Sequence, residues 1–158
     1  DGVYRHWRYI KFLAGNSKFQ YEKNIPSQNQ IDRLQIVNYP HGGGQLRDHV
    51  DPRRNQRVVS GLIMSKKGVD FESGGFYFRN KKNKKLNIED KLEIGDSVIF
   101  YGSIVHGVEK VDKYKKLNWK SYYGRWFIGM FVNDSNHLKN RITADDLSNS
   151  TNFKKKAS

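Results

Sequence analysis

The sequence contains no cysteine, which excludes disulfides, thiolate metal sites and cysteine nucleophiles. It also lacks any apolar run of about 18 residues, the length that a membrane-spanning helix needs. No secretory leader is visible in the residues that follow Asp1. These absences lead us to expect a cytoplasmic protein without a membrane span.

Acidic residues are scarce, since 16 Asp and Glu stand against 29 Lys and Arg and the net charge is +13. A basic surface favours anionic partners, which include nucleic acid, an anionic membrane and acidic small molecules. Many of the lysines stand in short clusters, and solvated turns account for such clusters equally well. The charge alone therefore identifies no partner.

Aromatic residues are plentiful by contrast, with 9 Tyr, 9 Phe and 3 Trp among 158 residues. This content, on a chain of ordinary domain length, predicts a folded β-rich domain with a polar surface. We expect a single domain over residues 1–158, with its core at about 34–132 and a polar C-terminal tail at about 134–158.

Short apolar segments separated by turn signals predict strands at 34–40, 46–51, 57–64, 74–79, 97–101, 106–111 and 122–132. Such regular short strands are typical of a sandwich or barrel. Residues 1–33 are expected to be strand or irregular structure with a loop at 24–28, and residues 143–147 to start a helix capped by Thr143. The chain is therefore predicted to be mainly β, with few or short helices.

Candidate metal ligands lie in the second of these strands. His49 and Asp51 are two residues apart, so in an extended strand both side chains point to the same face. His106, just after the apolar segment 97–101, would add a second imidazole. Two histidines and one carboxylate with open positions are the ligand set of non-haem Fe(II) oxygenases. A His-x-Asp pair alone also arises by chance, so its setting matters.

Four blocks supply that setting, in the order Tyr39–Pro52, Val58–Phe76, Gly95–Val108 and Gly124–Trp126. With these blocks the sequence resembles the Fe(II)/2-oxoglutarate-dependent oxygenases, in particular the prolyl-4-hydroxylase-like branch. The resemblance implies a double-stranded β-helix, or jelly-roll, whose open end holds the metal. It also implies hydroxylation of an unactivated C–H bond of a prolyl, peptidyl or amino-acid-like substrate, with decarboxylation of 2-oxoglutarate to succinate.

The resemblance assigns roles residue by residue. His49, Asp51 and His106 would bind Fe(II), with 2-oxoglutarate and O₂ as cosubstrates. Arg125 would hold the far carboxylate of 2-oxoglutarate, which suits the two parallel donors of a guanidinium. The hydroxyl of Tyr39 would bond to the same carboxylate.

Two features depart from the family pattern. Phe127 stands where many relatives have a serine that shares the cosubstrate carboxylate, and the insertion at 112–120, expected to loop out, lengthens the gap before Arg125. Substrate choice lies in variable loops, so candidate substrate residues are named only from their closeness in sequence to the ligands or to the Gly-Gly strand. They are Arg53, Arg54, Tyr77 and Trp126.

Two other functions stay open. The first is a non-catalytic, cupin-like metal-binding jelly-roll, against which Arg125 argues because a structural metal site needs no buried guanidinium. The second is a basic nucleic-acid-binding protein. Nucleic-acid demethylases of the family carry a second arginine six residues after the cosubstrate arginine, where this chain has Phe131. A small-molecule or peptide substrate, with acidic groups to suit the charge, is therefore preferred to nucleic acid as the partner.

Overall fold

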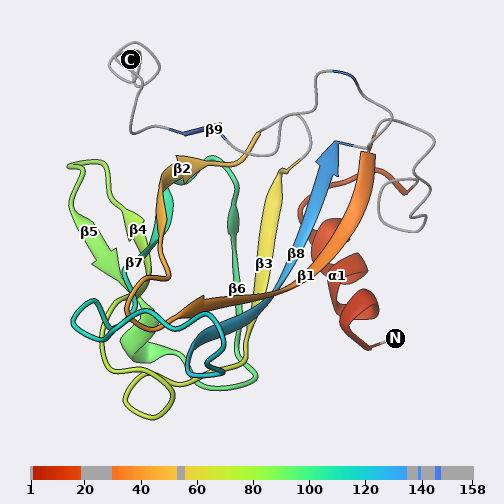
Figure 1. The fold of residues 1–158 in the computed structure, drawn as a ribbon. Helices are drawn as coiled ribbons and strands as arrows, with labels where there is room; N and C mark the ends of the chain where they lie inside the picture. The colour runs from red at the N-terminus through yellow and green to blue at the C-terminus, as the bar shows by residue number, and fades with distance from the viewer. Residues whose placement is uncertain (1, 19–29, 53–55, 135–138, 140–144, 147–158) are drawn as a thin grey trace.

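The computed structural model describes residues 2–18, 30–52, 56–134, 139 and 145–146. Within these ranges a single α-helix, α1 (Gly2–Leu13), precedes two antiparallel sheets (Figure 1). The strands are β1 (Gln30–Pro40), β2 (Leu46–Val50), β3 (Val58–Ile63), β4 (Gly75–Arg79), β5 (Lys85–Asn87), β6 (Ser97–Tyr101), β7 (His106–Glu109), β8 (Gly124–Asp134) and β9 (Asp145–Asp146). A short 3₁₀ helix, η2 (Glu89–Lys91), follows β5.

The strand order is that of a jelly-roll. One sheet has the order β1-β8-β3-β6 and the other β5-β4-β7-β2-β9. The first eight strands therefore pair across the molecule, the first with the eighth and the second with the seventh, as in a double-stranded β-helix. The predicted fold class, mainly β and jelly-roll, is confirmed.

The long pairing of β1 with β8 determines which side chains face the interior. It runs without interruption from Gln30 opposite Asp134 to Pro40 opposite Gly124. Because successive strand residues point to opposite faces, alternate residues of β8 face the space between the sheets and the others face outward. Arg125 and Phe127 belong to the inward set.

The residues between the sheets form an aromatic and aliphatic core. Its fully buried members are Phe71, Phe76, Val108 and Val111. Partly buried side chains packed against them come from both sheets, and they are Tyr39, Phe78, Ile88, Val98 and Phe100. Several of these residues also line the cavity described below.

The helix α1 covers the outer face of the first sheet. Trp7 and Ile10 pack on Met130, Val132 and Val58 of that face. The prediction of strand or irregular structure for residues 1–33 was therefore wrong over α1, while residues 30–33 belong to β1. The apolar contact residues of α1 are spaced three or four apart, which places them on one face of a helix.

The predicted helix near the C-terminus was also wrong where it can be checked. Asp145 and Asp146 form β9, which pairs with Val50 and His49 of β2. Thr143 and Leu147, the loop at 24–28 and nearly all of the predicted tail lie outside the described residues. No helix in the described ranges has the length and apolar character that crossing a membrane requires.

Candidate metal centre

Neighbouring strands bring the two candidate histidines face to face. His49 of β2 lies opposite His106 of β7, and their ring centroids are 4.2 Å apart. Asp51 follows β2 directly, and its backbone N–H donates to the carbonyl of Gly102 at 2.8 Å. One potential ligand atom from each of His49, Asp51 and His106 lies within 4.8 Å of the others. The structure thus assembles the three predicted ligands into one triad.

Hydrogen bonds determine which imidazole nitrogens are available to a metal. Nδ1 of His49 lies 2.9 Å from the carbonyl oxygen of Arg47, and Nδ1 of His106 lies 2.8 Å from that of Ile104. A carbonyl oxygen only accepts, so each Nδ1 carries a hydrogen, and in the neutral ring Nε2 keeps its lone pair. Metal-bound histidines are held in this way by their second nitrogen.

The surroundings of His106 favour its neutral form. Burial and, to a smaller extent, the neighbouring His49 lower the pKa of His106 to about 4, although the hydrogen bond to Ile104 raises it. The 3.6 Å contact between His106 Nε2 and Asp51 Oδ2 is therefore not an ion pair at neutral pH. It is a close approach of two potential metal ligands.

The triad lies in an apolar environment. Its three side chains belong to buried residues, and the rings of Phe100 and Phe76 lie 4.6 Å and 5.8 Å from the ring of His106. Two imidazole nitrogens and a carboxylate oxygen suit Fe(II) and similar divalent metals. Donor set, tautomers and grouping all fit a bound metal ion.

The triad lines an interior cavity of about 80 Å³ between the two sheets. Arg125 and Tyr39, the residues predicted to bind the cosubstrate, line the same cavity. Most of its remaining wall is apolar and includes Val59, Ile63, Val98, Phe100, Phe127 and Phe131. A candidate metal site and a buried guanidinium thus share one small, largely apolar space.

Arg125 has a protein partner that the sequence did not reveal. Its Nε donates to Oε2 of Glu89 at 2.8 Å, and the same oxygen accepts the backbone N–H of Phe76 at 2.7 Å. Arg125 is 3% exposed and Glu89 2%. Among the described residues this is the one hydrogen bond of the guanidinium, so both Nη nitrogens keep their donors for another acceptor.

The Glu89–Arg125 pair weakens the inference that a buried arginine distinguishes an oxygenase from a non-catalytic metal-binding protein. Glu89 supplies the anion that a buried arginine requires. Burial of Arg125 therefore does not by itself separate an oxygenase from a non-catalytic metal-binding jelly-roll. The informative feature is the position of Arg125 in the wall of the triad cavity.

Tyr39 lies directly opposite Arg125 in the β1–β8 pairing. Its ring stacks on Phe127, with centroids 6.0 Å apart and planes within 9°. Burial raises the pKa of Tyr39 to about 12, although the Arg125 charge lowers it. The hydroxyl is therefore protonated at physiological pH and can donate to a carboxylate.

Of the four candidate substrate residues, the two that the structure describes, Tyr77 and Trp126, do not line this cavity. Tyr77 faces the other side of its sheet, where its hydroxyl donates to Asp48. Trp126 occupies an outward position between Arg125 and Phe127, and its indole N–H donates to the carbonyl of Tyr122 at 2.7 Å. Arg53 and Arg54 lie outside the described residues.

Strand order and triad together define a jelly-roll protein with a candidate two-histidine, one-carboxylate metal centre. No protein-family model matches the chain. No curated protein matches it either.

One similar solved structure is a prolyl hydroxylase in complex with a hypoxia-inducible-factor oxygen degradation domain peptide fragment from Trichoplax adhaerens. The two are 19% identical with a TM-score of 0.46, over 66% of this chain and 44% of that one. This chain thus spans less than half the length of that protein.

Proposed function

We propose that this protein is an Fe(II)- and 2-oxoglutarate-dependent dioxygenase that hydroxylates an unactivated C–H bond. The observation that carries the proposal is the shared cavity, with the triad and the Arg125–Tyr39 pair in its wall. 2-Oxoglutarate has a chelating 2-oxo acid at one end and a second carboxylate at the other. A space lined by metal ligands and by carboxylate donors suits such a two-ended molecule.

His49, Asp51 and His106 would hold the iron and leave open coordination positions for the cosubstrates. When bound, the iron supplies the oxidising chemistry in which substrate C–H, 2-oxoglutarate and O₂ become alcohol, succinate and CO₂. The two Nη nitrogens of Arg125 and the hydroxyl of Tyr39 would hold the far carboxylate of 2-oxoglutarate.

Other groups of the chain orient the metal ligands and the guanidinium of Arg125. The carbonyls of Arg47 and Ile104 orient the imidazoles so that each Nε2 is a ligand atom. Glu89 holds the guanidinium of Arg125 through Nε and so fixes the direction of its remaining donors. The apolar wall, Phe100 and Phe127 included, limits the access of water, which strengthens charged interactions inside.

The substrate that we propose is a peptidyl-proline or another amino-acid-like group. The motif blocks around the triad, which resemble the prolyl-hydroxylase-like branch, support it. The net charge of +13 favours acidic groups in that substrate but does not identify it.

Succinate formation tests the proposal without a known substrate. The protein is incubated with Fe(II), 2-oxoglutarate and O₂, and succinate from uncoupled turnover is measured by proton NMR. The wild type should form succinate, and His49→Ala and His106→Ala should form none above background. His41→Ala is the matched control, because His41 stacks on Tyr123 away from the triad, and it should keep the activity.

Each alternative outcome has a definite meaning. Iron bound by the wild type with no succinate formed would indicate the non-catalytic metal-binding jelly-roll instead. Succinate formation that persists in His49→Ala and His106→Ala would remove the triad from the reaction.

A further inference from the structure

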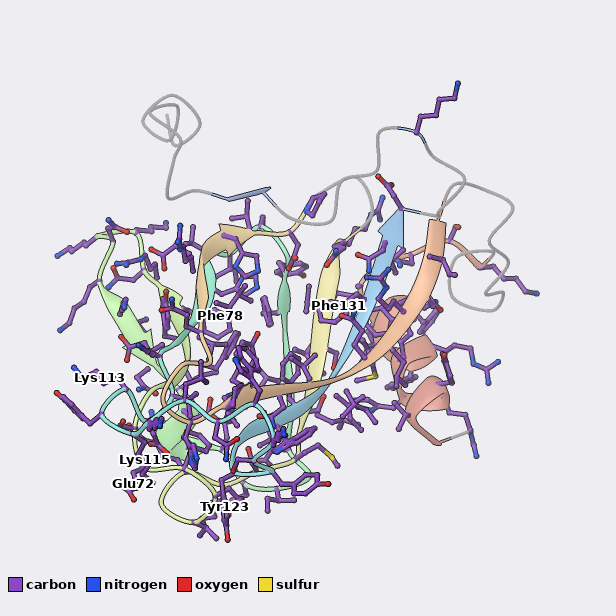
Figure 2. The ribbon with its side chains drawn as sticks, viewed as in Figure 1. Glu72, Phe78, Lys113, Lys115, Tyr123 and Phe131 are labelled. Carbon is purple, nitrogen blue, oxygen red and sulfur yellow. The ribbon has the colours of Figure 1, made fainter. Side chains whose placement is uncertain are left out.

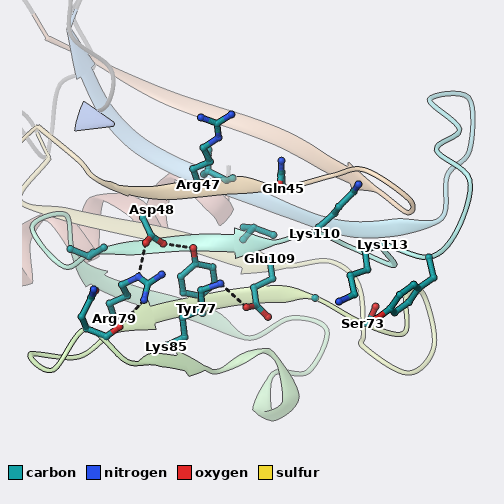
Figure 3. A pocket seen from close by; sticks show the side chains of 16 residues that line it. Gln45, Arg47, Asp48, Ser73, Tyr77, Arg79, Lys85, Glu109, Lys110 and Lys113 are labelled. Atoms are coloured by element: carbon teal, nitrogen blue, oxygen red, sulfur yellow. Dashed lines mark hydrogen bonds and ion pairs between the residues drawn. The ribbon is translucent and has the colours of Figure 1, made fainter. Parts of the chain in front are cut away.

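A second, larger hollow lies on the outer face of the β5-β4-β7-β2 sheet. This groove has a volume of about 850 Å³ (Figure 3). Its wall contains Tyr77 and Asp48, whose strand neighbours Phe76 and His49 line the interior cavity. Groove and metal cavity therefore lie on opposite sides of one sheet.

The groove is rich in positive charge. Its cationic side chains are Arg47, Arg79, Lys85, Lys110 and Lys113, and its acidic ones are Asp48 and Glu109. Both acidic groups already have partners in the wall, as the dashed lines in Figure 3 mark. Asp48 accepts from Arg79 Nε at 2.5 Å and from the hydroxyl of Tyr77, and Glu109 accepts from Lys85 Nζ at 2.8 Å.

Three cations of the groove are left for a ligand. Within the described residues, Arg47, Lys110 and Lys113 have no carboxylate partner, and Arg47 and Lys110 are exposed. Lys113 Nζ lies 4.8 Å from the centroid of the Tyr114 ring, which also lines the groove. An anion in the groove would thus meet Lys110 and Lys113 beside an aromatic ring, with Arg47 at the rim, where its side chain points away from Tyr77 (Figure 3).

The 112–123 loop contributes Lys113 and Tyr114 to the groove wall and carries further exposed aromatic residues among its lysines. Tyr114 is 86% exposed, Trp119 76%, Tyr122 86% and Tyr123 65%. Figure 2 shows Lys113, Lys115 and Tyr123 of this loop at the periphery of the molecule. Several large aromatic side chains exposed on one loop indicate an interaction surface.

The 112–123 loop is held firmly at its start, although it was expected only to loop out. Oδ1 of Asp112 accepts the backbone N–H groups of Glu72 and Ser73, both at 2.8 Å. The loop backbone also packs closely on Gly42, where an added Cβ would lie 2.4 Å from the carbonyl oxygen of Lys115. The loop therefore presents its rings from a defined position.

We propose that this groove and the 112–123 loop bind single-stranded nucleic acid with little sequence preference. The free cations would contact phosphates, and the exposed rings would stack on bases, which is the combination that such sites use. An acidic polypeptide would satisfy the cations but would not need the exposed aromatic rings. This inference is independent of the oxygenase proposal, because the groove lies on the other side of the sheet and has only Leu46 and Val108 in common with the wall of the metal cavity.

Fluorescence anisotropy with a fluorescein-labelled oligodeoxythymidine of about 15 nucleotides tests the inference. Lys110→Glu with Lys113→Glu reverses two charges in the groove region. Arg5→Glu with Arg8→Glu is the matched control. These two arginines are exposed on α1, which covers the other sheet, and their replacement lowers the net charge by the same amount as the groove pair. We expect the groove pair to weaken binding at least about tenfold and to lower the salt slope by about 0.7 per lost phosphate contact, and the control pair to do much less.

A second variant tests stacking without a change of charge. Tyr114→Ala should weaken binding at least about fivefold, as expected for the loss of one stacked base. Circular dichroism confirms that each variant is folded.

Three results would overturn the inference. They are no measurable binding by the wild type, equal losses in the groove and control pairs, or binding of poly-glutamate as tight as that of the oligonucleotide with Tyr114→Ala unchanged. The last result would make the groove a site for acidic polypeptides.

Discussion

Replacement of Glu89 by alanine should destabilise the protein strongly. One oxygen of Glu89 accepts both Arg125 Nε at 2.8 Å and the backbone N–H of Phe76 at 2.7 Å. Hydrogen bonds to a charged group contribute about 1.5–3 kcal/mol each. Removal of one partner of a buried ion pair costs about 3–5 kcal/mol, because the other charge is left uncompensated. We therefore expect Glu89→Ala to lower the free energy of unfolding by about 3–5 kcal/mol.

Urea unfolding followed by circular dichroism measures this loss. Glu93→Ala is the control, because Glu93 pairs with Lys66 at 2.7 Å while both side chains are largely exposed, at 63% and 43%. An exposed pair contributes about 0–1 kcal/mol, so this variant should be close to the wild type. Glu89→Gln should lie between the two, since the amide keeps an oxygen acceptor but loses the charge.

A double-mutant cycle with Arg125→Met isolates the pair. If Arg125 is buried because Glu89 compensates it, the double variant should be more stable than the sum of the two single losses predicts. The coupling should clearly exceed the roughly 0.5 kcal/mol within which independent sites add. Simple additivity would refute the reasoning and would mean that the two side chains contribute separately.

Three further predictions concern other parts of the molecule. Tyr39→Phe should raise the 2-oxoglutarate concentration needed for half-maximal succinate formation about tenfold or more, with no new pH dependence between pH 6 and 9, because the pKa of about 12 keeps the hydroxyl protonated. Burial raises the pKa of Asp112, but the backbone donors of Ser73 and Glu72 together with Lys115 lower it below its ordinary value. The stability of the wild type over Asp112→Asn in urea unfolding should therefore be present at neutral pH and vanish as the pH falls through the lowered pKa. Trp7→Ala should cost about 3–5 kcal/mol in the same assay, because the 1% exposed indole fills the space under α1.

The strands were predictable because their patterns are local. Apolar and β-branched residues alternate or run together between glycine, lysine and asparagine turns, and this pattern placed β3, β4, β6 and β8 within a few residues. The order of the strands followed from the resemblance, and it is now visible in the sheets. That the side chains of His49, Asp51 and His106 lie close together was predicted from the local strand pattern and from the family resemblance.

The helix α1 was missed because its residue types mislead. Trp7, Tyr9, Ile10 and Phe12 are aromatic or β-branched, which favours strands. The spacing of Val3, Trp7, Ile10 and Ala14 is the signal that was available, because it repeats every three or four residues.

Glu89 carried no local signal at all. It lies in η2, 36 residues before Arg125, and an isolated glutamate in a polar segment is normally exposed. The outward positions of Tyr77 and Trp126 were missed for a related reason. Closeness in sequence to a site does not specify which face of a strand a side chain occupies.

The central claim is that one cavity holds both iron and the 2-oxo acid. It is tested most directly by anaerobic titration of the Fe(II)-loaded protein with 2-oxoglutarate, which follows the weak visible charge-transfer band of a chelated 2-oxo acid. We predict that the band forms in the wild type. In the paired variant Arg125→Leu with Glu89→Gln it should need at least about tenfold more 2-oxoglutarate, because the charged contact to the far carboxylate is lost. Iron that binds the triad with no band at any 2-oxoglutarate concentration would contradict the claim.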